Sequence, residues 1–108
     1  MDMRLYAVAS DGPKPESQVS EQAARASCYL LFDDTGTILD VLDNPVSDAA
    51  GHAAPQTAAF LEGKGIRGLI AARFGHRMRG ELASRGIGLV EMQGDVETTI
   101  RAFLKGQQ

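Results

Sequence analysis

The chain has 108 residues, of which 44% are hydrophobic and 23% charged, and its formal net charge at pH 7 is −3. This length suffices for one hydrophobic core, so we expect a single domain over residues 1–108, and the acidic balance argues against nucleic acid as the main partner. Apolar runs such as 28–32 are too short to cross a membrane, and a lone cysteine without a secretory leader pattern predicts a cytoplasmic protein.

The first part of the chain predicts three strands. Arg4–Ala9 is a short apolar run that ends at a Ser-Asp-Gly-Pro turn. Two further strands are expected over Ser27–Asp33 and Thr37–Asp43, and the Asp-Thr-Gly sequence between them is typical of a tight turn. The second and third strands should therefore form an antiparallel hairpin, which ends where Pro45 cannot donate a ladder hydrogen bond.

The rest of the chain predicts three helices that alternate with two strands. Pro55 lies where a first helical turn tolerates proline. Ile66–Ala72 is nearly all apolar, so this strand is expected to be covered on both faces. In chain order we expect a helix from about Ala54 to Leu61, the strand Ile66–Ala72, a helix over Gly75–Arg85, the strand Ile87–Met92 and a last helix capped by Asp95.

This order of elements predicts an α/β fold with three layers, α/β/α, around a five-stranded mixed sheet. The ribonuclease H-like arrangement fits best, with strand order 3-2-1-4-5 and only the second strand antiparallel to the others. The carboxyl ends of the other four strands then meet at one edge, where open α/β sheets usually bind their ligands. The loops expected at that edge are 10–26, 44–54, 72–76 and 92–94.

Three of these loops carry motifs in a specific order and spacing. Ser20–Ala26 leads into the second strand, and the loop 44–56 begins with Asn-Pro and continues with glycine and histidine. Ala71–His76 follows the fourth strand and contains arginine, glycine and histidine. Together these motifs make the chain resemble the dinitrogenase iron–molybdenum cofactor biosynthesis family over nearly its whole length.

Members of that family typically have a Ser-x-His-Phe-Gly-Arg-Ala-like segment before the second strand. Ser20, Arg25 and Ala26 match this segment. Gln22 stands where the family has histidine, and two alanines replace the Phe-Gly pair. The substitution at Gln22 removes one expected ligand.

The resemblance implies a small carrier or accessory protein rather than an enzyme. Its cargo would be an anionic metal–sulphur cluster or an iron–molybdenum cofactor precursor, and its partners would be cluster-assembly or acceptor proteins, with neither nucleic acid nor membrane involved. Such a cargo favours imidazole ligands, guanidinium groups and the free N–H groups at helix starts. We expect three helices to start at this edge. The candidate binding residues are Ser20, Gln22, Arg25, His52, Arg73, Gly75 and His76, and the candidate metal ligands among them are His52 and His76.

Each candidate also has a simpler interpretation. His52 and His76 could be surface histidines, Arg25 could pair with Glu21, and the single Cys28 could be a core residue rather than a ligand. The arginines from Arg67 to Arg85 could form a solvated helix face. Two other functions therefore stay open: an interaction module of the same fold that has lost cofactor binding, and a small hydrolase on a ribonuclease H-like scaffold.

Overall fold

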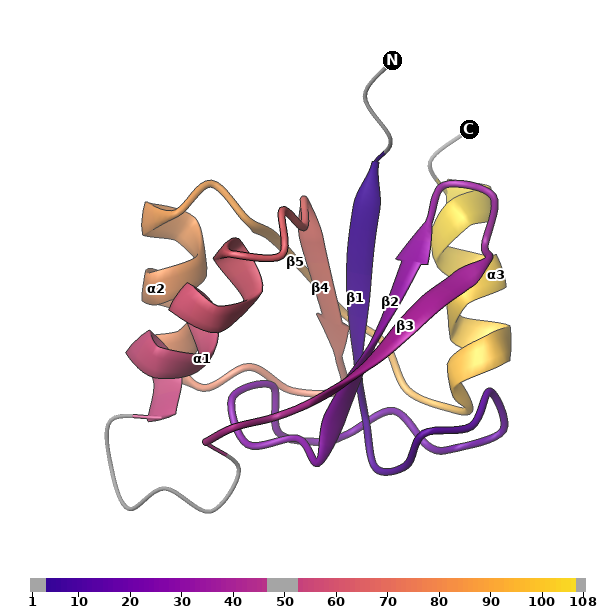
Figure 1. Ribbon diagram of the computed structural model, residues 1–108, viewed down its shortest axis with the longest axis horizontal. Helices are drawn as coiled ribbons and strands as arrows, with labels where there is room; N and C mark the ends of the chain where they lie inside the picture. The colour runs from indigo at the N-terminus through magenta and orange to yellow at the C-terminus, as the bar shows by residue number, and fades with distance from the viewer. Residues whose placement is uncertain (1–3, 47–52, 107–108) are drawn as a thin grey trace.

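The computed structural model describes residues 4–46 and 53–106, and it confirms the predicted fold class (Figure 1). The strands are β1 (Leu5–Ser10), β2 (Cys28–Asp33), β3 (Ile38–Asp43), β4 (Gly68–Ala71) and β5 (Gly88–Glu91), and the helices are α1 (Ala53–Glu62), α2 (His76–Ser84) and α3 (Val96–Gly106). The sheet order is β3-β2-β1-β4-β5. β2 pairs antiparallel with both neighbours, whereas β1, β4 and β5 are parallel. The predicted boundaries agree with these elements to within two residues.

The helices cover both faces of the sheet, with α1 and α2 on one face and α3 on the other (Figure 1). Because successive side chains of a strand point to opposite faces, β1 contributes Ala7 to the core under α1 and α2 and Tyr6 to the core under α3. The second core contains an aromatic cluster in which the ring of Phe103 lies 4.9 Å from Tyr6 and 6.0 Å from Phe32. Leu30, Phe32, Leu69, Ile70 and Phe103 are all buried, as expected.

Local sequence signals explain where the elements turn and end. In the hairpin turn, the Asp33 carboxylate accepts the N–H groups of Thr35 and Thr37, and Gly36 supplies a positive φ of 88°. At the end of α2, Gly86 adopts a φ of 72°, and the N–H of Ile87 returns to the helix as in a Schellman motif. These signals are local, which is why the sequence alone predicts them.

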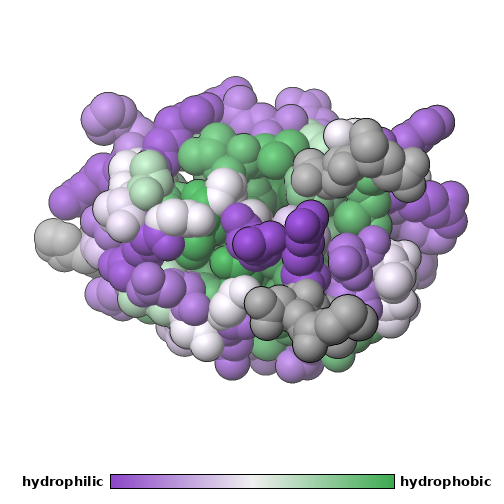
Figure 2. All heavy atoms as spheres, turned by 90° about the horizontal axis from the view of Figure 1, so that it is seen from above, coloured by the Kyte–Doolittle hydropathy of each residue, from purple (hydrophilic) through white to green (hydrophobic). Residues whose placement is uncertain are grey.

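The loops after β1, β4 and β5 and residues 44–46 after β3 gather at one edge of the sheet, drawn at the bottom of Figure 1. The opposite end of the molecule, seen from above in Figure 2, has hydrophobic residues that surround a few hydrophilic residues at its centre, and further hydrophilic residues on its flanks. Within the described part of the chain, no helix has the length and apolar character needed to cross a membrane. We expect a polar binding site at the loop edge, because the carboxyl ends of the parallel strands meet there.

Leu69 lies fully buried on the inner strand β4, so Leu69→Ala should lower the free energy of unfolding by about 2–5 kcal/mol. The matched control is Leu39→Ala on the edge strand β3, where the side chain is 45% exposed and the loss should stay within about 0.5 kcal/mol. Denaturant titration measures both. Equal losses would show that β4 is not the centre of the core.

Two hydrogen-bonded carboxylates should make the fold sensitive to acid. The Thr35 side chain lowers the pKa of Asp33, and the Thr98 N–H lowers the pKa of Asp95, both from an ordinary 3.8. Because these pKa values are lower in the folded state, the stability they contribute is present above pH 3.8 and is lost as the pH falls through the native values. Asp95→Asn keeps the cap acceptor and removes the titration, so its free energy of unfolding should change less than wild type's between about pH 5 and about pH 2. Identical pH profiles would contradict this.

Candidate functional site

The long connection between β1 and β2, residues 11–27, crosses the loop edge of the sheet. The Ser20 N–H donates to Ala9 O at the end of β1, and the Ser20 carbonyl accepts the N–H of Ala72 after β4, at 2.8 and 2.9 Å. The N–H of Val19 donates to Gly94 O after β5. These bonds hold the connection across the carboxyl ends of three parallel strands, as the predicted convergence of the loops requires.

A cavity of about 490 Å³ lies between this connection and the first turns of α1 and α2. Five of the seven candidate residues line it, namely Gln22, Arg25, Arg73, Gly75 and His76. The other lining residues are Glu21, Ala23, Ala24, Ala53, Ala54, Arg77 and Met78. The structure thus brings together residues from two loops and from the first turns of α1 and α2, which are far apart in the sequence.

Of the other two candidates, Ser20 does not line this cavity. Ser20 is only 4% exposed, and its hydroxyl accepts the N–H of Gln22 at 3.1 Å and donates to the carbonyl of the same residue at 3.3 Å. Ser20 therefore shapes the turn that presents Gln22, and it lines a neighbouring polar cavity of about 460 Å³ instead. His52 lies outside the residues that the structure describes.

The charge at the cavity is mostly positive. Arg25, Arg73 and Arg77 line it together with one acid, Glu21. Within the described ranges, Arg73 and Arg77 make no ion pair, and both side chains are exposed. A multivalent anion in this cavity would therefore meet guanidinium groups whose charge no described carboxylate neutralises.

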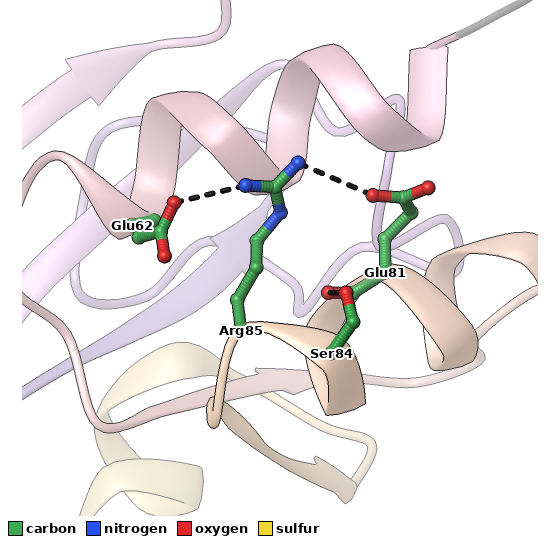
Figure 3. Close-up of polar contacts among 4 residues, drawn as sticks. All are labelled: Glu62, Glu81, Ser84 and Arg85. Carbon is green, nitrogen blue, oxygen red and sulfur yellow. Dashed lines mark hydrogen bonds and ion pairs between the residues drawn. The ribbon is translucent and has the colours of Figure 1, made fainter.

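Other arginines in the same basic stretch are neutralised away from the cavity. Arg79 pairs with Glu91 at 2.7 Å, and the same carboxylate accepts the N–H of Phe74 at 3.4 Å. Arg85 lies between Glu62 of α1 and Glu81 of α2, at 2.9 and 3.2 Å (Figure 3). Arg85 thus links the two helices that flank the cavity.

Two helix starts line the cavity. The N-cap of α2, Gly75, has no side-chain cap, and neither α1 nor α2 has an acidic residue in its first turn. The N–H groups of the first turn of α2 are thus available to an anion, which the helix dipole also favours. α3 also begins beside the connection 11–27, because the N–H groups of Val96 and Glu97 donate to Ser17 O and Pro15 O. It does not line the cavity, since it packs on the other face of the sheet and the Asp95 carboxylate caps it through the Thr98 N–H.

Sequence reasoning missed a buried polar cluster beneath the cavity wall, formed by Tyr29, Asn44 and Thr57. The Thr57 hydroxyl donates to Ala24 O at 2.8 Å, and the Asn44 amide donates to the same oxygen at 3.0 Å. The Asn44 amide also donates to Ala26 O, and the Tyr29 hydroxyl donates to Ala23 O. Polar side chains at core-facing positions of β2 and α1 were the available signal.

The cavity is poor in metal ligands. The described residues contain no group of three or more histidine, cysteine or acidic side chains that could hold a metal ion. His76 is the imidazole among the residues that line the cavity. Cys28 lines neither of the two cavities, and it is buried in the core under α3, as its simpler interpretation expects.

Comparisons with known proteins identify relatives across the whole fold. The family model described as "Dinitrogenase iron-molybdenum cofactor" matches residues 3–106. A "putative NifB protein" from Thermotoga, solved by NMR, is 30% identical, with a TM-score of 0.82 over 97% of this chain and 90% of that one. The apo form of the orange protein from Desulfovibrio gigas is 25% identical, with a TM-score of 0.88 and coverage of 98% and 91%.

A "putative dinitrogenase" from Methanocaldococcus jannaschii is 14% identical, with a TM-score of 0.69 over 99% of this chain and 93% of that one, and this likeness concerns the fold alone. No curated protein matches the chain.

The environment of Cys28 leads to a prediction about its reactivity. Burial raises the pKa of its thiol, and the nearby charges of Asp43 and Asp11 raise it further. Since the thiolate is the reactive form, the native protein should react slowly with a chromogenic thiol reagent at neutral pH and rapidly once denatured. Fast labelling of the native protein would show that Cys28 is accessible from the loop edge.

Proposed function

The chain belongs to the dinitrogenase iron–molybdenum cofactor family, and we propose that it is a carrier that binds an anionic metal–sulphur species in the loop-edge cavity. The cargo is a metal–sulphur cluster or an iron–molybdenum cofactor precursor, and the partners are cluster-assembly or acceptor proteins. The observation that carries this proposal is the meeting of three arginines with an uncapped helix start around one cavity.

The donor set suits an anion better than a bare cation. Guanidinium groups bond sulphide or carboxylate oxygen through several N–H donors, and helix N–H groups add further donors without a charge of their own. The volume of about 490 Å³ lies in the range of small-ligand sites, which is roughly 300–1,000 Å³. The alanines and Met78 supply an apolar wall beside these donors.

Metal coordination has a smaller part in this proposal than charge does. His76 stands at the start of α2 and lines the cavity, where its imidazole is the candidate metal ligand among the described residues. A neutral imidazole can occupy one open metal site of a cluster. Gln22, in place of the family histidine, offers an amide where a second imidazole would stand.

The proposed carrier acts by binding and release and catalyses no reaction. Arg73, Gly75, His76 and Arg77 are exposed at the cavity, so a partner protein can approach the cargo directly. A hydrolase on this scaffold would need several acids around a divalent metal, and the described residues offer no such group. The replacement at Gln22 favours the interaction module as the second candidate.

Anaerobic reconstitution with iron, molybdate and sulphide tests the proposal. Wild-type protein should take up metal in a fixed ratio per chain, measured by metal analysis and visible absorption. The absence of uptake under every reconstitution condition would remove the carrier function and leave the interaction module.

Variants separate the two kinds of contact. Arg25→Ala should weaken binding about 10- to 100-fold at low salt and leave the spectrum of the bound species unchanged, because it removes charge-assisted hydrogen bonds. His76→Ala should change the spectrum, because it removes a metal ligand, and His52→Ala is expected to behave in the same way. Gln22→His should tighten binding if the missing imidazole limits it.

The matched control is Arg101→Ala. Arg101 lies on α3, where it pairs with Glu97, and it does not line the cavity. Its loss changes the net charge as Arg25→Ala does, so binding by this variant should match wild type. Equal weakening by both substitutions would mean that overall charge rather than the cavity holds the anion.

A further inference from the structure

The wall of the cavity between Gln22 and Arg25 is irregular backbone, yet buried side chains hold two of its carbonyl groups, those of Ala23 and Ala24. The hydroxyl of Tyr29 donates to Ala23 O, and the side chains of Thr57 and Asn44 both donate to Ala24 O. These three side chains come from β2, from the end of β3 and from α1. Each is buried, with Tyr29 and Thr57 fully so.

Peptide geometry links these carbonyl groups to the N–H groups on the other side of the wall. In a trans peptide unit the C=O of one residue and the N–H of the next point in opposite directions, and the described chain contains no cis peptide bond. When the core holds Ala23 O, the N–H of Ala24 must therefore point away from the core. Ala24 lines the cavity, and its N–H has no hydrogen-bond partner within the described residues.

We propose that Tyr29, Asn44 and Thr57 are positioning residues that fix the two peptides on either side of Ala24, so that the Ala24 N–H is a donor to the anion in the cavity. Tyr29 turns the Ala23–Ala24 peptide through Ala23 O, and Thr57 and Asn44 hold the next peptide through Ala24 O. This inference rests on the proposed function of the cavity and adds to it a backbone donor that the side-chain pattern does not reveal. A backbone N–H fixed in this way needs no reorganisation when an anion arrives, and it adds to the arginine charges without a charge of its own.

Burying three polar side chains costs free energy unless they are hydrogen-bonded, and their bonds to the loop meet this requirement. A buried hydroxyl or amide must keep its hydrogen bonds, because an unsatisfied polar group in a low-dielectric interior is expensive. The Asn44 amide nitrogen also lies 3.3 Å from the Tyr29 hydroxyl, and the Asn44 oxygen accepts the N–H of Val46. The three side chains thus form hydrogen bonds with one another and with backbone groups of the loop, which favours one conformation of the loop above them.

Molybdate provides the probe, because it is a simple dianion whose binding does not depend on cluster assembly. In a ¹H–¹⁵N spectrum of the wild-type protein, the Ala24 amide proton should shift downfield and saturate as molybdate is added. An Ala24 signal that does not respond to molybdate overturns the inference.

Thr57→Val removes the hydroxyl at nearly constant shape, and it should weaken molybdate binding about 3- to 10-fold and reduce the shift of the Ala24 amide proton. Thr57→Ser keeps the donor and should restore both. The control is Thr99→Val on α3, since Thr99 is equally buried, at 2% exposure, and its hydroxyl has no hydrogen-bond partner. Thr99→Val should titrate like wild type.

If Thr57→Val does not fold, Tyr29→Phe makes the same comparison, because it removes only the hydroxyl that holds Ala23 O. Molybdate titrations in which Thr57→Val or Tyr29→Phe behaves like Thr99→Val would overturn the positioning role. The result of the molybdate titration is independent of the result of cluster reconstitution. An Ala24 response to molybdate without cluster uptake supports the inference and removes the carrier function, and cluster uptake without an Ala24 response does the reverse.

Discussion

The site depends on how the long connection between two adjacent antiparallel strands satisfies its own backbone. β1 and β2 could be joined by a two-residue turn, but residues 11–27 lie between them and cross the edge of the sheet. Buried N–H and C=O groups in such a segment need partners. The ends of β1, β4 and β5 supply some of them, and the side chains of Tyr29, Asn44 and Thr57 supply others.

The cores on the two faces of the sheet differ in their content of buried polar side chains. The core under α3 is an ordinary apolar packing with an aromatic cluster of Tyr6, Phe32 and Phe103. The core under α1 and α2 also contains the polar cluster that holds the loop. The site therefore lies on one side of the sheet, between the two helices that Arg85 joins at their far ends.

Ion pairs elsewhere on the surface determine where the unneutralised positive charge lies. The sequence places several arginines in and around α2, but Glu91, Glu62 and Glu81 neutralise Arg79 and Arg85 away from the cavity. Positive charge is thus concentrated where the loop, the α2 start and Arg73 meet. Among the described residues this wall offers many donors and few metal ligands, which supports a cargo held mainly through its negative charge and released without breaking several coordination bonds.

The sequence by itself determined the order of elements, the hairpin and the edge at which the loops meet, because strand runs, turn residues and helix stops are local signals. It also brought Gln22, Arg25, Arg73 and His76 together, since the carboxyl ends of parallel strands share one edge. Only the tertiary structure decided that Ser20 is buried within the loop, that α3 packs on the face of the sheet opposite the cavity, and that Arg79 and Arg85 form ion pairs. Thr57 bonds Ala24 and Arg85 bonds Glu62 across more than twenty residues of sequence, and no periodicity or motif predicts a pairing that folding alone creates.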